Sequence, residues 1–151
     1  DVLYHALTRL EALDACTYDV IVMLQPTCPF RSDSHVRDCL RKLIHEDLDS
    51  VWSLSMTDSK AHPLKQLTLQ DNRMDYYDSL GGQIIARQQL EPLYHRNGAA
   101  YAISRTCLLD QHSIKGARSS AVVIEDPLVN IDTPDDLEYA EYLLEKGKVA
   151  V

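Results

Sequence analysis

The chain has 151 residues, a formal net charge of −8 and 25% charged residues, and this length suits one domain with a core of its own. Such an acidic chain is not expected to bind nucleic acid or an anionic membrane surface. It has no apolar run near the roughly 20 residues that span a bilayer. The four cysteines lack metal-ligand spacing and no secretory signal is visible, so we expect reduced thiols and a cytoplasmic protein.

A helix and a strand are predicted first. Apolar residues from Val2 to Leu13 recur at helical spacing and predict an amphipathic helix that ends near Ala15. The β-branched apolar run over 19–24 predicts a strand buried in a parallel sheet. It stops at the sequence QPTCPFR (25–31), whose two prolines exclude both helix and central strand and predict a rigid, extended loop.

This loop is the first candidate for a functional site. Open α/β sheets bind their ligands beyond the carboxyl ends of strands, and the loop offers amide, hydroxyl and guanidinium groups at such a position. The alternative is an ordinary strand followed by a proline-rich turn. Ser32 or Asp33 can cap a second helix that extends to Ile44, and residues 49–56 alternate as a strand does. Strand, helix and strand form a βαβ unit, so we expect an α/β fold with a mainly parallel sheet.

The second half of the chain is predicted to be more varied. Residues 64–69 and the Asp71-Asn72 turn indicate a short hairpin, and 74–93, which has no clean period, indicates an extended arm or a short helix. The remaining predicted elements are a strand over 98–103, a helix over 105–111 capped by Ser104, a strand over 121–124, a strand stub that ends at 130–132, and a last helix that begins after Thr133 and ends at Gly147.

Four segments resemble one known family in the same order. LQPTCPFR (24–31) is similar to the LQPTSPLR motif of the acylneuraminate cytidylyltransferases, and AHPLK (61–65) to their HPLK element. RQQL (87–90) followed by HRNGAAY (95–101) is similar to RQ-L and RPNGAIYI, and VNIDTPDDL (129–137) to the closing IDIDT-EDL motif. The resemblance spans nearly the whole chain.

The resemblance implies a fold, a reaction and an assembly. The fold would be a Rossmann-like domain of the nucleotide-diphospho-sugar transferase type over 1–151, with an arm at about 66–95 that packs against a second subunit of a homodimer. The reaction would join CTP to a nine-carbon keto-sugar acid and release pyrophosphate, with Mg²⁺ as cofactor. We see no pattern for nucleophilic catalysis, and positioning with charge neutralisation suffices for this chemistry.

The resemblance also assigns residues to roles. The sugar side would be held by polar and cationic groups at seven positions: Gln25, Lys65, Arg87, Gln89, Arg96, Asn97 and Tyr101. The catalytic positions would be Gln25, Arg31 and Asp132, and Mg²⁺ would be held by Asp132 with Asn130, where the family has a second aspartate. Each has a plainer reading: a helix-capping or turn residue for Asp132, a surface cation for Arg31 or Lys65, a turn for Asn97-Gly98 and a core aromatic for Tyr101.

One element of the family pattern is not expected in this sequence. The family opens with a loop that contains glycine, arginine and lysine and wraps the CTP phosphates, whereas the first glycine here is Gly81. Three interpretations stay open: an active enzyme, a catalytically incomplete homologue that acts as a sugar-acid-binding or assembly module, and a piece completed by a separate N-terminal chain. All three predict dimerisation, because strand edges and apolar helix faces left exposed have to be covered.

Overall fold

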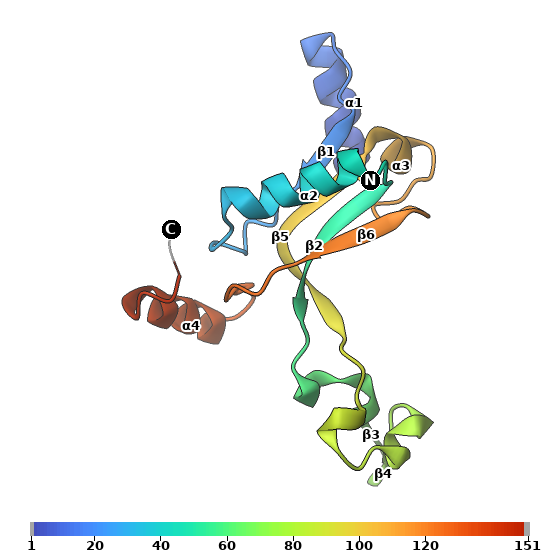
Figure 1. The fold of residues 1–151 in the computed structure, drawn as a ribbon, viewed down its shortest axis with the longest axis vertical. Coiled ribbons are helices and arrows are strands. Elements are labelled where there is room, and N and C mark those ends of the chain that lie inside the picture. The colour runs from blue at the N-terminus through green and yellow to red at the C-terminus, as the bar shows by residue number, and fades with distance from the viewer. Residues whose placement is uncertain (1, 150–151) are drawn as a thin grey trace. The chain divides into compact units, whose positions relative to one another are not determined.

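The computed structural model describes residues 2–149, which form two compact units. The first unit contains the chain up to Leu54 and from Arg96 onward, and the second is Ser55–His95, within which the predicted arm falls. A four-stranded sheet has the order β1 (Val20–Met23), β5 (Tyr94–Ser104), β2 (Ser50–Met56) and β6 (Ser119–Val123), as Figure 1 shows. Four helices accompany it: α1 (Val2–Asp14), α2 (Asp33–His45), α3 (Arg105–Leu109) and α4 (Pro134–Glu145).

The sheet is mixed, with one strand opposed to the other three. Strand β1 pairs antiparallel with β5, and β2 pairs parallel with β6. Ser104 N donates to Asp49 O, and the Ser53 hydroxyl bonds Ala100. The residue number of the β5 partner falls as that of the β2 residue rises, so β2 and β5 are antiparallel. The α/β fold is therefore confirmed, with β1, β2 and β6 running in the same direction. The sheet is mixed, because β5 runs the opposite way and lies between β1 and β2, the two strands of the predicted βαβ unit.

The predicted helix caps are confirmed, and one predicted strand is wrong. Ser32, Ser104 and Thr133 each accept a hydrogen bond from the first turn of α2, α3 and α4. Residues 130–132, predicted as a strand stub, are not a strand. The reason is local: the Asp136 carboxylate accepts hydrogen bonds from the backbone N–H groups of Asp132 and Thr133, so the helix cap takes donors that a strand ladder would need.

The core of the first unit lies on both faces of β5. Tyr101 and Ile103 pack with Leu7 of α1 and residues of α3. Ala100 and Ala102 point to the opposite face, because side chains alternate along a strand, and there they pack against Cys39 and Leu43 of α2. A further cluster anchors α4 through Phe30, Val129, Ala140 and Leu143.

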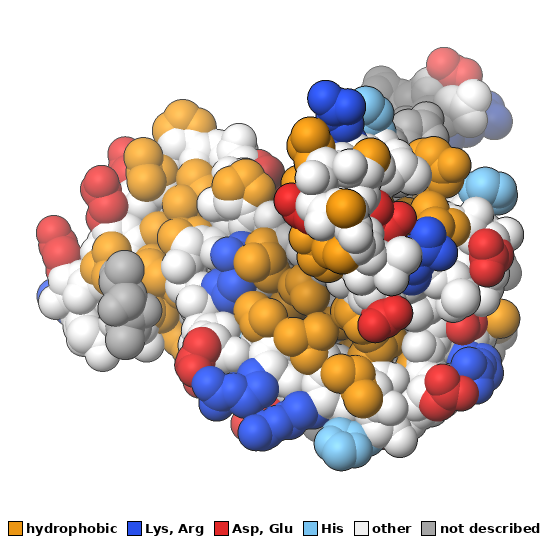
Figure 2. Space-filling view, turned by 90° about the horizontal axis from the view of Figure 1, so that it is seen from above, with side chains coloured by type: hydrophobic (Ala, Val, Ile, Leu, Met, Phe, Trp, Pro, Cys, Tyr) orange, Lys and Arg blue, Asp and Glu red, His pale blue; other side chains and the backbone are white. Residues whose placement is uncertain are grey.

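Several apolar side chains of the first unit remain exposed. Val2, Leu10 and Leu13 of α1 are all exposed, and β1 lies at one edge of the described sheet. In the face drawn in Figure 2, hydrophobic side chains gather near the middle and charged ones lie mostly around the rim. All four cysteines are free thiols, and Cys28, Cys39 and Cys107 are buried. None of the helices within residues 2–149 is long and apolar enough to cross a membrane.

The second unit is built from a hairpin and four short 3-10 turns. The predicted hairpin is confirmed as β3 (Leu67–Gln70) and β4 (Arg73–Tyr76), which pair antiparallel. The turns are η1 (Ser59–Ala61), η2 (Pro63–Lys65), η3 (Ser79–Gln83) and η4 (Arg87–Gln89). Gly81 of η3 is buried because the Tyr76 ring and the Leu64 carbonyl group occupy the space where a side chain would project.

Candidate functional site at the carboxyl end of β1

The QPTCPFR loop leaves the carboxyl end of β1 and is fastened to β5. Gln25 N donates to Gly98 O at 3.2 Å. The Arg31 guanidinium donates to two backbone carbonyl groups, those of Ala99 on β5 and of Gln25 in the loop itself. Hydrogen bonds from a charged donor are the stronger kind. Arg31, expected to face the substrate, therefore joins the two ends of the loop to β5 and positions Gln25.

Gly98 lets the Gln25 side chain lie directly against β5. Its φ is +77°, in the left-handed region that favours glycine, and a Cβ placed there would overlap Gln25 Oε1. Gln25 is half-buried, and its amide has two donor hydrogens and an acceptor oxygen that suit sugar or ribose hydroxyl groups. The glycine thus fixes where this amide can sit.

Asn97, expected to contact the sugar, has its amide oxygen bound inside the protein. Oδ1 accepts from the Ser53 hydroxyl at 2.6 Å and from Ala99 N at 3.1 Å. The Ser53 hydroxyl in turn accepts from Ala100 N at 2.8 Å. These contacts, all buried, hold the part of β5 on which the loop docks.

Thr27 connects the loop to the predicted metal ligands. Thr27 O accepts from Ile131 N at 2.8 Å, and the Thr27 hydroxyl bonds Asn130 Oδ1 at 2.5 Å. The Asn130 amide nitrogen donates to the Asp132 carboxylate, so these two exposed side chains lie together. The hydroxyl of Thr133 and nearby N–H groups hold the pKa of Asp136 below its usual range.

The side-chain oxygens of Asn130 and Asp132 fit a magnesium ion that takes most of its ligands from water or from a bound molecule. They provide one carboxylate and one amide oxygen, and residues 2–149 contain no cluster of three or more His, Cys, Asp or Glu side chains that could enclose a metal. Mg²⁺ is commonly held by one or two carboxylates together with water and substrate phosphate oxygens. The pair therefore leaves most positions around such an ion to ligands from outside the protein.

Arg96 and Tyr101 both lie against the ring of Trp52. The Arg96 guanidinium carbon is 5.7 Å from the centroid of the Trp52 ring, and the Trp52 and Tyr101 rings meet edge to face at 5.4 Å. Tyr101 is only 2% exposed, and burial raises the pKa of its hydroxyl group. Of the two roles open to Tyr101, the packing favours the core aromatic, whereas Arg96 is exposed.

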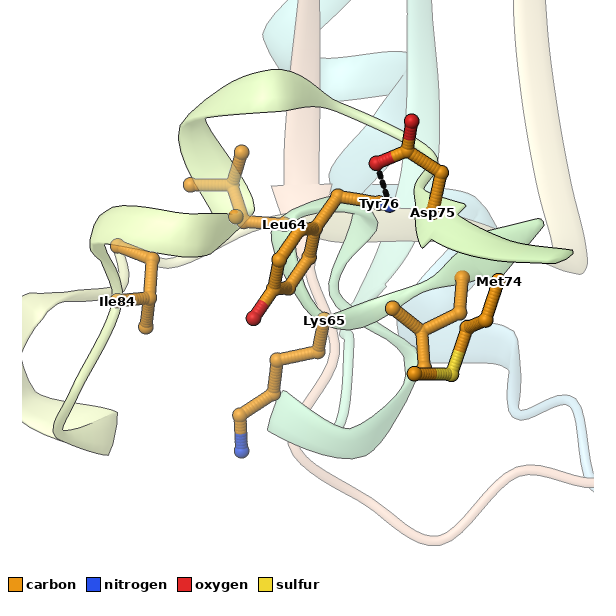
Figure 3. A pocket seen from close by; sticks show the side chains of 8 residues that line it. Leu64, Lys65, Met74, Asp75, Tyr76 and Ile84 are labelled. Atoms are coloured by element: carbon orange, nitrogen blue, oxygen red, sulfur yellow. Dashed lines mark hydrogen bonds between the residues drawn. The ribbon is translucent and has the colours of Figure 1, made fainter.

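Lys65 belongs to a cavity of the second unit. This cavity, of about 410 Å³, is lined by Lys65, Asp75, Tyr76, Ile84 and neighbouring apolar residues. Figure 3 shows the Tyr76 ring near the middle of the cavity, with the Lys65 side chain extending away below it. The stem of Lys65 thus borders the cavity, while its ammonium group extends away from the Tyr76 ring.

Arg87 and Gln89 follow in η4, and their side chains do different things. Gln89 Oε1 accepts from Ile85 N and Ala86 N, both at 2.8 Å, and so caps its own turn. Arg87 lines another cavity of the second unit, of about 440 Å³.

The first unit therefore brings together Gln25, Arg31, Asn97, Asn130 and Asp132 around the loop, whereas Lys65, Arg87 and Gln89 belong to the second unit. Sequence reasoning assigned no role to Thr27, Ser53 or Trp52. The first two make the hydrogen bonds that organise the site. Thr27 lay inside a motif, and Ser53 was a polar residue in an alternating strand, so both carried a signal.

The comparisons with known proteins agree with the motifs. No family model matches the chain. The N-acylneuraminate cytidylyltransferase of Streptococcus agalactiae serotype V is 31% identical over 117 residues, which are 76% of this chain and 28% of the relative. The post-translational flagellin modification protein B of Campylobacter coli is 22% identical over 147 residues, which are 96% of this chain and 61% of that protein. The chain thus spans little more than a quarter of the length of the streptococcal relatives that it matches.

A solved structure shares the fold. CMP:2-keto-3-deoxy-manno-octonic acid synthetase, solved with CTP, matches with a TM-score of 0.57 at 14% identity over 92% of this chain and 67% of that chain. This likeness concerns the fold, that of the nucleotide-diphospho-sugar transferases. The sequence matches, the four ordered motifs and the shared fold together show that this chain is related to the acylneuraminate cytidylyltransferases, as its sequence predicted.

Proposed function

We propose that this chain takes part in transferring a cytidylyl group from CTP to a keto-sugar acid of the sialic acid type. The observation that carries the proposal is the meeting of three motif segments beyond β1: the loop with Gln25, the Gly98–Ala99 segment and the Asn130–Asp132 segment. Ligands of open α/β sheets bind at such an edge. The names of the relatives, a cytidylyltransferase and a synthetase that bound CTP, support the same substrates.

The proposed reaction needs no covalent intermediate with the protein. The anomeric hydroxyl oxygen of the sugar acid forms a bond to the α-phosphorus of CTP. The bond from that phosphorus to the oxygen bridging the β-phosphate breaks, pyrophosphate leaves, and the hydroxyl proton passes to solvent. The protein's task is to align the two substrates and to neutralise charge. The Gln25 amide, positioned by Gly98 and Arg31, serves alignment by binding hydroxyl groups.

We place Mg²⁺ at Asp132 with Asn130, where it would supply charge neutralisation for the triphosphate. Since this pair carries one negative charge, the ion should bind weakly without nucleotide. Asn130→Asp adds a second carboxylate and should tighten Mg²⁺ binding in a calorimetric titration. An unchanged affinity would count against this position for the ion.

The cations proposed for the sugar side belong each to its own unit, Arg96 to the first and Lys65 and Arg87 to the second. Each of these three side chains is exposed, and each carries a positive charge of the kind that pairs with a carboxylate. Gln89, Asn97 and Tyr101, whose polar or aromatic groups contact the protein itself, would act by holding the surrounding backbone. Four free thiols support a reducing compartment such as the cytoplasm.

The proposed homodimer rests on the surface of the second unit. Both strands of its hairpin are exposed along their whole length, and its exposed apolar residues include Leu67, Leu69, Met74, Tyr76, Tyr77, Leu80 and Ile85. Apolar surface of this kind is typical of an interface. Ile85→Asp should convert the dimer to a monomer in analytical ultracentrifugation, whereas Ile44→Asp, at an exposed position of α2, should not. A monomeric wild-type protein would overturn this part of the proposal.

Pyrophosphate release tests the reaction. The chain is incubated with CTP, Mg²⁺ and N-acetylneuraminate or 2-keto-3-deoxy-manno-octonate, alongside Asp132→Ala and the control Glu138→Ala, which removes an exposed charge from α4. Release that depends on the sugar acid, that Asp132→Ala abolishes and that Glu138→Ala leaves intact, is the expected result. Binding of sugar acid without any release would favour the binding module, and neither binding nor release would overturn the proposal.

A further inference from the structure

Arg96 carries a guanidinium group that lies over an aromatic ring and has its N–H donors unused. Its carbon is 5.7 Å from the centroid of the Trp52 ring, and the side chain is exposed. Among the residues that the structure describes, this guanidinium group makes no hydrogen bond or ion pair. Other arginines of the first unit do: Arg31 donates to backbone carbonyl groups, and Arg105 pairs with a carboxylate of α1. The donors of Arg96 are therefore available to a ligand.

The Trp52 ring on which Arg96 lies is itself fixed. Its Nε1 donates to Ile114 O at 3.0 Å. The buried Tyr101 ring meets it edge to face at 5.4 Å. A guanidinium group is attracted to the face of an aromatic ring, and tryptophan attracts it most strongly. A side chain that is oriented before the ligand arrives loses less conformational entropy on binding.

Gly98 explains how Arg96 reaches this ring. Side chains alternate along a regular strand, so residues 96 and 101 of β5 would point to opposite faces of the sheet. Arg96 and Tyr101 nevertheless both lie against Trp52. Gly98, with a φ of +77°, lies between them, and a glycine in this left-handed conformation is typical of a bulge that interrupts the alternation.

Arg96 is also close in the chain to the docking point of the Gln25 loop. Gln25 N donates to Gly98 O, and the Gln25 side chain lies against Gly98. Two residues of strand span about 7 Å, so Arg96 and the Gln25 amide can contact the same small ligand. The Thr27 end of the loop contacts Asn130 instead. An unpaired cation in a chain of net charge −8 is a local attraction for an anion, and a guanidinium group matches a carboxylate with two parallel hydrogen bonds.

We propose that Arg96 and Trp52 determine the specificity for a sugar acid: the guanidinium group, oriented by the Trp52 ring, donates to the carboxylate of the ligand. Arg96 contacts the ligand, and Trp52 is a positioning residue. This inference rests on the proposed function and adds to it the pair that distinguishes an acid from a neutral sugar.

Four single substitutions separate the charge, its geometry and its orientation. Arg96→Gln removes the charge, whereas Arg96→Lys keeps the charge but not the planar group. Trp52→Leu removes the aromatic face, whereas Trp52→Phe keeps one. The double variant Trp52→Leu/Arg96→Gln tests whether the ring acts through the arginine. Arg9→Gln, at an exposed position of α1, is the matched control.

The test is a calorimetric titration of the whole chain and each variant with N-acetylneuraminate and with its methyl ester, which lacks the negative charge. Arg96→Gln should weaken binding of the acid by about 10- to 100-fold and should bind acid and ester alike. Arg96→Lys should restore only part of the affinity. Trp52→Leu should weaken binding of the acid by about 2- to 5-fold, with no further loss in the Arg96→Gln background. Trp52→Phe should retain most of the affinity, and Arg9→Gln should bind as wild type does.

A second readout needs no change at Trp52. Because Trp52 is the single tryptophan, the fluorescence of the wild-type chain reports on the ring beneath Arg96. The acid should shift this emission and the ester should not, and Arg96→Gln should remove the shift. An emission that acid and ester change alike would contradict the proposal.

The outcomes separate the inference from the function on which it rests. Unchanged affinity of Arg96→Gln for the acid would overturn the inference and leave the proposed function standing. An equal effect of Trp52→Leu with and without Arg96 would overturn the positioning role of the ring. A loss of CTP binding in Arg96→Gln, with binding of the acid retained, would assign the cation to a phosphate and contradict the proposal. A wild-type chain that binds no sugar acid would overturn both the inference and the function.

Discussion

Gly98 gives the sharpest test of how the loop is held. In Gly98→Ala, two independent costs arise. The left-handed φ of +77° costs an alanine about 1–2 kcal/mol. The new Cβ would also overlap Gln25 Oε1 and lie 3.3 Å from its Cδ, an overpacking of the kind that costs about 1–3 kcal/mol. The Gln25 side chain must move away from β5, so the substitution should reduce ligand binding as well as stability.

A second glycine separates the two costs. Gly147, after α4, has a φ of +60° and nothing within 4 Å of the position of a Cβ. Gly147→Ala therefore carries the backbone cost alone. Urea unfolding followed by fluorescence of Trp52, the single tryptophan, should show Gly98→Ala as the more destabilised variant. In a Gln25→Ala background, which removes Oε1 and Cδ, the extra cost at Gly98 should largely disappear.

Two results would contradict close packing of Gln25 against Gly98: equal losses of stability in Gly98→Ala and Gly147→Ala, or a cost at Gly98 that the Gln25→Ala background leaves unchanged. Either result would mean that the Gln25 side chain is not confined by β5. The site would then lack the fixed amide on which alignment of the substrate depends.

Three further predictions concern the second unit, the loop and the last helix. Gly81→Ala would place a Cβ 2.6 Å from the Leu64 carbonyl oxygen, so it should destabilise the second unit by about 1–3 kcal/mol. Gly82→Ala should not, because its Cβ would lie at an ordinary 3.4 Å from the Tyr76 ring. Equal rates of hydrogen exchange for residues 55–95 in the two variants would contradict this. Arg31→Met removes the guanidinium group that donates to the Gln25 and Ala99 carbonyl groups, and it should lower the free energy of unfolding by about 2 kcal/mol in urea. An unchanged urea midpoint would show that these two hydrogen bonds do not hold the loop. Because the pKa of Asp136 is lowered in the folded state, its carboxylate stabilises the fold fully above the unfolded pKa of 3.8, and this stability is lost as the pH falls through the lower folded pKa. Asp136→Asn should therefore make the stability depend less on pH in the acid range. An unchanged pH dependence would show that the Thr133 cap does not matter.

The elements that the sequence predicted well depend on short-range chemistry. Ser32, Ser104 and Thr133 lie directly before their helices, and each bonds a backbone N–H three residues later. The Asp71-Asn72 turn is similarly local, with both residues at positive φ. Such signals involve neighbours in the chain, so a single sequence contains them.

What could not be predicted depends on pairing between distant segments. Nothing near residues 94–104 indicates that this strand inserts between β1 and β2, because its partners are about 50 to 80 residues away in sequence. The hydrogen bonds of Arg31 to Ala99 and of Thr27 to Asn130 follow from that insertion and docking. The contact of Arg96 with Trp52 was equally hidden, since the two residues are distant in sequence.

Nucleotide binding is the most direct test of the proposed function. The measurement is a calorimetric titration of the wild-type chain with CTP in millimolar Mg²⁺, repeated with Asp132→Ala and, as control, Glu138→Ala. The meeting of the Gln25 loop with Asn130 and Asp132 predicts saturable binding that Asp132→Ala abolishes and Glu138→Ala retains. No heat with wild type, or equal binding by Asp132→Ala, would contradict the assignment of a nucleotide and metal site to this edge of the sheet.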